Sequence, residues 1–245
     1  MLLKNKNILI TGAGKGIGEQ LVQSAIKNGA FVYAVIKDKR DNRKFKENKN
    51  IKIYNGNVKN ENLFKKIFKD SEKEQKKINC LINNAGVRFR KKFLKIKSKE
   101  LKDVFETNFF SIFSILQLTS EFWIKRKIQG SVINLASIVG QTGFEDLSVY
   151  AATKGAVISL TKSFSVEMAK YGIRANSISP GFTKTSFYEK FKKKKKLYNW
   201  TLSRIPMKRW GTTDEISNLI LFVISDKSKY LNGENISIDG GWINS

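Results

Sequence analysis

A tyrosine and a lysine four positions apart, Tyr150 and Lys154, are the residues whose types and spacing point most directly to chemistry. Residues at i and i+4 share one face of a helix, so the lysine ammonium can lie near the phenol. An unperturbed tyrosine has a pKa near ~10, and a neighbouring cation lowers that pKa because it favours the phenolate. Such a pair can exchange a proton with an alcohol or a carbonyl oxygen.

The composition of the chain makes this pair more significant. The sequence contains no histidine and a single cysteine, Cys80, which excludes Ser-His-Asp and Cys-His arrangements, histidine or thiolate metal sites and an intrachain disulfide. Proton chemistry must therefore use other groups, and no metal site is predicted. A lone cysteine is also typical of a reducing compartment, so a cytoplasmic location is expected.

Two further polar residues are placed to assist proton transfer. Ser137 ends a predicted strand, where its hydroxyl can hydrogen-bond a substrate oxygen without acting as a nucleophile. Asn108 falls on a helical stripe that is otherwise apolar, which directs its amide inward. A turn serine and a satisfied core amide are the ordinary structural explanations of such residues. The catalytic interpretation therefore depends on their occurring together with the tyrosine, the lysine and a cofactor site.

A glycine-rich turn at residues 11–18 lies between the first predicted strand and a helix that opens at about Gly16. Glycines without a Cβ let the backbone approach a pyrophosphate, and free amides at the helix N-terminus stabilise its charge. The strand before the turn and the helix after it predict a dinucleotide site. The predicted cofactor contacts in this turn are Gly12, Lys15, Gly16, Ile17 and Gly18.

Short apolar segments alternate with segments of helical periodicity along the whole chain. Strands without polar alternation are typical of a parallel sheet covered on both faces. With no repeat and no linker, the pattern predicts one doubly wound, Rossmann-type α/β domain over residues 1–245, with a seven-stranded parallel sheet and helices on both faces. Ligands bind such sheets beyond the carboxyl ends of the strands. Strands are predicted at 6–11, 31–36, 51–54, 80–82, 131–136, 174–179 and 235–238, and helices at 16–28, 63–68, 101–115, 150–171 and 214–225.

Six motifs, in order, resemble those of short-chain dehydrogenases and reductases. They are the glycine turn, Asn83-Asn84-Ala85-Gly86, Asn108, Ser137, Tyr150-Ala151-Ala152-Thr153-Lys154 and Pro180-Gly181. Near the carboxyl end, Arg209-Trp210-Gly211 and Asp239-Gly240-Gly241-Trp242 match the family as well. The resemblance therefore covers essentially all 245 residues.

The resemblance implies hydride transfer between NAD(P)(H) and a ketone or secondary alcohol. Tyr150 would exchange the proton with the substrate oxygen, while Lys154 would hold the cofactor ribose and, with the positive edge of a bound nicotinamide, lower the tyrosine pKa. Ser137 would orient the oxygen, and Asn108 would hold a water that links Lys154 to solvent. Further implied cofactor contacts, besides Tyr150 and Lys154, are Lys37, Asn57, Val58, Asn84, Ala85, Gly86, Pro180, Gly181, Thr183 and Thr185.

Charge at the end of the second strand bears on which cofactor is used. NAD-dependent members of the family commonly carry an acid where this chain has Ile36. Lys37 and Lys15 occupy positions where NADP-dependent members carry a base that pairs with the 2′-phosphate. NADP(H) is therefore favoured, and NAD(H) stays open because the Asp38 carboxylate could reach the ribose instead. Asn57 stands where the family usually has aspartate, and it can still accept a hydrogen bond from adenine.

Residues 183–206 are predicted to form a substrate lid within the domain. This segment carries aromatic residues and the lysine run 192–196, and a second basic group lies at 88–92. Cations near a pocket mouth favour an anionic substrate, although the general excess of lysine explains them equally. Residues 83–91 and 204–211 resemble those of gluconate 5-dehydrogenases and deoxy-ketogluconate dehydrogenases, so a sugar acid such as gluconate or a ketogluconate is the leading substrate. The alternative is a 3-oxoacyl-acyl-carrier-protein reductase, whose acidic carrier would suit the basic residues 125–127.

The net charge of +25 raises the question of other partners. The lysines are scattered and the aromatic residues do not interleave with them, which argues against nucleic acid. A non-catalytic dinucleotide- or nucleic-acid-binding protein is a further alternative, against which the intact Ser137, Tyr150 and Lys154 set speaks. The apolar tract 109–118 is about half the ~20 residues that cross a bilayer, so no membrane partner is expected. The family resemblance implies a homotetramer or homodimer.

Overall fold

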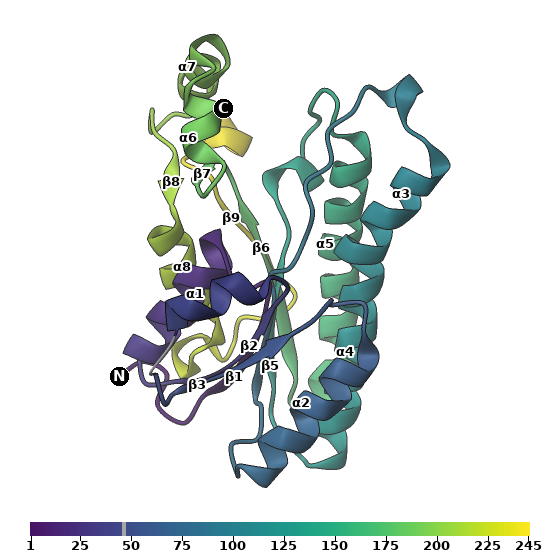
Figure 1. Cartoon of the computed structure of the whole chain (residues 1–245), viewed down its shortest axis with the longest axis vertical. Helices are drawn as coiled ribbons and strands as arrows, with labels where there is room; N and C mark the ends of the chain where they lie inside the picture. Colours follow the sequence, from purple (N-terminus) through teal and green to yellow (C-terminus); the bar gives the residue numbers. More distant parts are fainter. Residues whose placement is uncertain (46–47) are drawn as a thin grey trace.

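A seven-stranded parallel sheet forms the centre of the computed structural model, which describes residues 1–245 except 46 and 47 (Figure 1). The strands lie in the order β3-β2-β1-β4-β5-β6-β9. The chain thus moves outward from β1, returns to place β4 beside β1, and moves outward on the other side. The predicted doubly wound α/β fold is confirmed. The strands are β1 Asn7–Thr11, β2 Phe31–Ile36, β3 Ile51–Asn55, β4 Cys80–Asn83, β5 Ser131–Leu135, β6 Arg174–Pro180 and β9 Asn235–Ile238.

Helices cover both faces of the sheet, with α1 and α8 on one side and α2, α4 and α5 on the other (Figure 1). Successive residues of β1 enter opposite cores, since Ile8 and Ile10 pack with the α1 and α8 side while Leu9 packs with the other. Burial on both faces explains the apolar runs 8–10 in β1 and Phe31–Ile36 in β2. No helix in the described part of the chain has the length and apolarity to cross a bilayer. The helices of the two layers are α1 Gly16–Lys27, α2 Glu61–Lys73, α4 Ser111–Lys125, α5 Ser148–Met168 and α8 Thr213–Ile224.

The long helix predicted around Asn108 is interrupted. α3 (Ser98–Phe105) continues through a π-helical turn (Glu106–Phe110) before α4 begins. Asn108 lies in that turn and is fully buried, as its place on the apolar stripe predicts, whereas Leu101 is 39% exposed. The prediction that Leu101 and Asn108 share one buried helical face is wrong for Leu101, because the π turn between α3 and α4 changes the helical register. Such turns occur frequently at functional sites.

The segment predicted as a lid contains regular structure that the sequence did not indicate. α6 (Tyr188–Lys192) and α7 (Lys195–Arg204) lie together at one end of the molecule, near the C-terminus (Figure 1). A two-stranded sheet of β7 (Thr183–Lys184) and β8 (Gly211–Thr212) joins this segment to the main body. The shared core of this end is aromatic and includes Phe191, Trp210 and Trp242.

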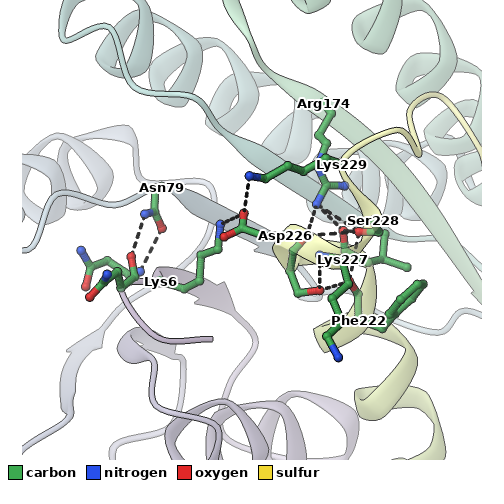
Figure 2. A network of polar contacts seen from close by, with 12 residues as sticks. Lys6, Asn79, Arg174, Phe222, Asp226, Lys227, Ser228 and Lys229 are labelled. Carbon is green, nitrogen blue, oxygen red and sulfur yellow. Dashed lines mark hydrogen bonds and ion pairs between the residues drawn. The ribbon is translucent and has the colours of Figure 1, made fainter. Parts of the chain in front are cut away.

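A network of polar contacts lies at the amino ends of the strands, opposite the carboxyl ends (Figure 2). Lys6, just before β1, pairs with Asp226 at 2.9 Å. Arg174, the first residue of β6, donates to the carbonyl of Ser225 at 3.1 Å and to the hydroxyl of Ser228 at 3.3 Å. These contacts tie the segment after α8 to the sheet and leave the carboxyl ends for ligands. The remaining short turns are η1 Lys39–Phe45, η2 Phe93–Lys95, η4 Ile138–Gly140, η5 Ala169–Tyr171, η6 Asp226–Ser228 and η7 Trp242–Asn244.

Candidate active site

A cavity of 510 Å³, here called the central cavity, lies beyond the carboxyl ends of β4, β5 and β6. Ser137 reaches it from the end of β5, and Tyr150 and Lys154 reach it from the first turns of α5. Residues implied to contact the cofactor line the same space. The structure thus brings together residues that lie far apart in the sequence: besides the three above, Ile17, Asn84, Gly86, Pro180, Gly181, Thr183 and Thr185.

The phenol of Tyr150 is in an environment that favours its protonated form. Burial raises the pKa of Tyr150 above its usual value, while the charge of Arg88 and a hydrogen bond with Ser137 offset part of that rise. The lowering expected from Lys154 is not seen in the protein alone. The Lys154 nitrogen lies 5.8 Å from the centre of the Tyr150 ring, and the cation that acts on the phenol is Arg88. A protonated phenol is the form that can donate to a carbonyl oxygen.

Lys154 is buried at the base of the central cavity, with 4% of its surface exposed. Its ammonium donates a 2.5 Å hydrogen bond to the carbonyl of Leu135, the last residue of β5. Burial lowers the pKa of Lys154 to about 8, because the charged form loses its hydration. A lysine with such a pKa can release and regain a proton close to neutral pH.

Asn108 lies beside this lysine and fixes the chain after β4. Its amide oxygen accepts from the Val87 N–H at 2.8 Å, and its amide nitrogen donates to the Val87 carbonyl at 2.9 Å and to the Thr153 hydroxyl at 3.2 Å. A Cβ built on Gly86 would stand 3.3 Å from the Asn108 oxygen and 3.8 Å from the Lys154 nitrogen. Asn108 in the π turn and the buried ammonium of Lys154 therefore both lie next to Gly86.

The glycine turn has no room for a side chain at Gly12 or at Gly18. Gly12 and Gly16 have positive φ angles of 65° and 55°. A Cβ on Gly18 would lie 2.2 Å from the Gly12 carbonyl oxygen. The Asn84 amide also donates to that oxygen, at 3.0 Å, and so joins the turns after β1 and β4. The bare backbone beside the start of α1 fits the approach of a pyrophosphate.

A second cavity, of 620 Å³ and here called the distal cavity, lies between the glycine turn and the end of β2. Lys15 and Lys37 line it as predicted, together with Asp38. The sequence interpretation missed Arg40 and Asp41, which line it from the following 3₁₀ turn. Both residues lie shortly after the end of β2, and this position was the sequence signal that could have identified them.

Two of the cations in the distal cavity, Arg40 and Lys15, lie next to acids. Two guanidinium nitrogens of Arg40 donate hydrogen bonds to the Asp38 carboxylate, at distances from 2.6 to 3.1 Å. These bonds hold the Asp38 pKa well below its usual range. Lys15 lies 3.6 Å from Asp41. Asp38 is therefore already neutralised by a protein cation. The predicted adenine contacts Asn57 and Val58 follow β3 and are not among the residues that line either cavity.

A third cavity, of 740 Å³ and here called the outer cavity, adjoins the central one. Its walls combine aromatic rings with Arg90, Lys196 and Arg204, and the acid among the lining residues is Glu145. Arg88, Phe144, Leu147 and Phe182 line both the outer and the central cavity. The basic group at 88–92 and the lysine run at 192–196 thus each place a cation at this opening.

Comparison with known proteins agrees with this geometry. A family model described as enoyl-(acyl carrier protein) reductase matches residues 12–243. The 3-oxoacyl-acyl-carrier-protein reductase FabG of Thermotoga maritima is 34% identical over 249 residues, which cover 99% of this chain and 100% of the relative. The similarity therefore extends from the glycine turn to the aromatic C-terminal turn.

Solved structures of the same fold include proteins with bound cofactor. A 4-hydroxyisoleucine dehydrogenase complexed with NADH has a TM-score of 0.92 and 29% identity, over 98% of this chain and 99% of that one. ElxO with NADP bound has a TM-score of 0.90 and 30% identity, over 98% and 99%. A protein from Agrobacterium tumefaciens provisionally described as a gluconate dehydrogenase has a TM-score of 0.93 and 27% identity, over 99% and 98%.

Proposed function

The chain belongs to the short-chain dehydrogenase/reductase family, and from this premise we propose that it reduces the 3-oxo group of an acyl thioester with NADPH. It is an NAD(P)-dependent oxidoreductase that acts on CH–OH groups. The observation that carries the finer proposal is the 34% identity to a 3-oxoacyl-acyl-carrier-protein reductase over the full length of both chains. This support favours the acyl thioester over the sugar acid that local motifs suggested.

The residues of the central cavity fit a proton donor for the ketone. The nicotinamide dinucleotide supplies the hydride when it is bound. Tyr150 donates its proton to the substrate oxygen, and Ser137, which hydrogen-bonds the phenol, holds that oxygen in place. Lys154 supplies a proton for the reprotonation of Tyr150, since its pKa of about 8 lets it exchange protons. Asn108 keeps the loop after β4 in register with this lysine.

The distal cavity supports a preference for NADP(H). The glycine turn lies between the distal and the central cavity. It fits a pyrophosphate, because a Cβ at Gly12 or Gly18 would meet backbone atoms within 3 Å. Lys15, Lys37 and Arg40 would surround the 2′-phosphate of the ribose. The pairing of Asp38 with Arg40 leaves that carboxylate less able to repel a phosphate. Comparing kcat/KM with NADPH and NADH tests the preference, and a strong preference for NADH contradicts it.

A sugar acid is the second candidate substrate. The cations Arg90, Lys196 and Arg204 of the outer cavity favour it, as does the structural similarity to the protein provisionally described as a gluconate dehydrogenase. Assays with an acetoacetyl thioester, gluconate and 5-ketogluconate, each with both cofactors, separate the candidates. Turnover of the thioester supports the proposal, and turnover of the sugar acids alone contradicts it.

Residues 183–206 are proposed as the substrate lid of a single catalytic domain. Thr183, Thr185 and Phe187 line the central cavity, while Lys196, Trp200 and Arg204 line the outer one. One continuous segment therefore covers both openings. Tyr188 and Tyr198 join α6 to α7 through hydroxyl groups 3.1 Å apart, which lets the two helices move as one unit.

A further inference from the structure

Arg88 is an unusual cation on the loop after β4. Its neighbours on that loop have acidic partners, since Arg90 lies 3.5 Å from Asp146 and Lys91 lies 2.7 Å from Glu100. Among the described residues, no carboxylate lies within 4.0 Å of the Arg88 guanidinium. An arginine stays charged at any physiological pH. The protein thus presents an uncompensated positive charge at this point.

The surroundings of Arg88 hold that charge between two cavities. Arg88 lines both the central and the outer cavity. Its guanidinium lies 5.0 Å from the centre of the Phe187 ring, which belongs to the proposed lid. Burial lowers the pKa of Arg88, while the Tyr150 phenol raises it, so the guanidinium is partly dehydrated and close to the proton donor. A partly dehydrated cation without a counter-charge gains free energy when an anion binds to it.

Most of the other charged side chains that line the two cavities are cations, which favour an anion. The ionisable residues that line the central cavity are Arg88, Tyr150 and Lys154, and no acid lies among its described lining residues. In the outer cavity Arg90 is paired, but Lys196 and Arg204 have no acid within 4.0 Å among the described residues. Arg204 instead lies 5.4 Å from the Trp242 ring. A substrate that enters from the outer cavity therefore passes several cations, and Glu145 is the acidic side chain among the described residues that line its path.

We propose that Arg88 is a specificity-determining residue whose guanidinium binds an anionic group of the substrate, a carboxylate or a phosphate, while the ketone oxygen lies between Tyr150 and Ser137. The proposal rests on the proposed function of the central cavity as the site of ketone reduction, but not on which ketone is reduced. A guanidinium offers two parallel N–H groups that match the oxygens of either anion. The centre of the Phe187 ring in the proposed lid lies 5.0 Å from the guanidinium, and the ring occupies space beside it, which limits the positions that the anion can take.

Substrate pairs in which one member carries an anionic group and the other does not test this proposal. Acetoacetate and methyl acetoacetate form a carboxylate pair, acetoacetyl-coenzyme A and acetoacetyl-N-acetylcysteamine form a phosphate pair, and 5-ketogluconate and an uncharged ketose form a sugar pair. The kcat and KM values of each are measured for the wild type, Arg88→Met and Arg88→Lys. Lys92→Met is the matched control, because it removes one positive charge from an exposed position on the same loop, outside the cavities.

The expected result is a loss confined to charged substrates. In at least one pair, Arg88→Met lowers kcat/KM for the charged member about 10- to 100-fold more than for the neutral member, mainly through KM, because a charge-assisted hydrogen bond is lost. Arg88→Lys restores part of the difference, and Lys92→Met behaves like the wild type. The pair that responds identifies a carboxylate or a phosphate as the recognised group.

Other outcomes overturn the proposal. Equal losses for charged and neutral members show that Arg88 acts only through Tyr150, and no loss shows that it does not act on the substrate. Calorimetric titration of the NADP⁺-saturated protein with the charged compounds covers substrates that bind without turnover, and the absence of binding to the wild type also overturns it. Failure of the thioesters alone contradicts the proposed function, while the other pairs still decide the role of Arg88.

Discussion

At the scale of single residues, we expect the loss of the Tyr150 hydroxyl to remove the chemistry while leaving the proposed cofactor site intact. Tyr150 is partly buried near Ser137 and Arg88, and a phenylalanine keeps the ring but cannot donate a proton. We expect Tyr150→Phe to lower kcat about 10²- to 10⁴-fold, the usual contribution of a general acid. NADPH affinity, measured by nucleotide fluorescence, should change little. Turnover at the wild-type rate would remove Tyr150 from its proposed role.

Burial of Lys154 predicts an unusual dependence of stability on pH. The folded pKa of about 8 lies below the ordinary value of 10.5, so between these values the unfolded chain binds more protons and stability rises with pH. Below this window the full penalty applies, of about 3 kcal/mol. We therefore expect Lys154→Met to be more stable than the wild type at neutral pH, with the gap shrinking as the pH rises towards 10.5.

Urea unfolding without cofactor measures this effect at about pH 7 and about pH 9.5. The difference between wild type and variant is the quantity that matters, because other lysines and tyrosines titrate in both proteins. A gap that stays constant between the two pH values would show that Lys154 keeps its ordinary pKa in the folded chain.

The Arg40–Asp38 pair predicts how cofactor preference can be changed. Arg40→Ala removes one cation from the distal cavity and releases the Asp38 carboxylate, which then favours ribose hydroxyls over a 2′-phosphate. We expect the ratio of kcat/KM for NADPH to that for NADH to fall about 10- to 100-fold. Lys39→Ala is the comparison, since Lys39 lines the same cavity without an ion pair among the described residues. An unchanged ratio in Arg40→Ala would contradict the assignment.

Which single residues could be predicted depends on how their neighbours are fixed. Tyr150 and Lys154 share a helix, so their relation follows from spacing alone. The electrostatic environment of the Tyr150 phenol does not follow from spacing. Arg88 approaches the phenol from a loop about sixty residues away in the sequence, next to Phe187 of the proposed lid. Arg40 was missed for the same reason, since a turn decides where its side chain points.

At the scale of elements, the glycine turn is the part most sensitive to a single methyl group. A Cβ on Gly18 would stand 2.2 Å from the Gly12 carbonyl oxygen and 2.6 Å from the Asn84 amide. Gly18→Ala should therefore displace the turn, with a large loss of NADPH affinity and a fall in melting temperature. Gly143→Ala is the control, because no atom lies within 4 Å of a Cβ built there. Wild-type NADPH affinity in Gly18→Ala would show that the turn does not hold the cofactor.

The central strands were predictable and the lid helices were not. β1, β2 and β5 are buried on both faces, so the continuous apolar run is the same signal that the sheet itself requires. α6 and α7 are short and separated by the lysine run, and their stability comes from packing against Trp210 and Phe182 rather than from periodicity. The π turn at Asn108 has no pattern of its own, which is why one helix was predicted where two occur.

At the scale of the whole molecule, the two ends of the sheet have different tasks. The amino ends are closed by the network around Asp226 and Arg174, whereas the carboxyl ends carry all three cavities. The distal cavity, the glycine turn and the central cavity run in sequence along this edge. The position of the proposed cofactor site thus follows from the doubly wound fold, which the sequence predicted.

The substrate is harder to predict because the outer cavity is assembled from distant segments. Segments around residues 88–90, 142–147, 196–204 and 242–245 all contribute to its lining. Local resemblance in two of these segments pointed to a sugar acid, while identity over the full length favours an acyl thioester. Substrate choice is therefore a property of the folded molecule rather than of any one motif.

Transfer of deuterium from reduced cofactor to product tests the central claim most directly. The protein is incubated with NADPH carrying deuterium at C4 of the nicotinamide and with acetoacetyl-N-acetylcysteamine, and the product is analysed by mass spectrometry and proton NMR. Hydride transfer predicts one deuterium at C3 of the 3-hydroxybutyryl thioester with one of the two C4-labelled forms, and formation of this product at least about 100-fold slower in Tyr150→Phe under the same conditions. A reduced product without deuterium from either form, or no reduced product at all, would contradict the account.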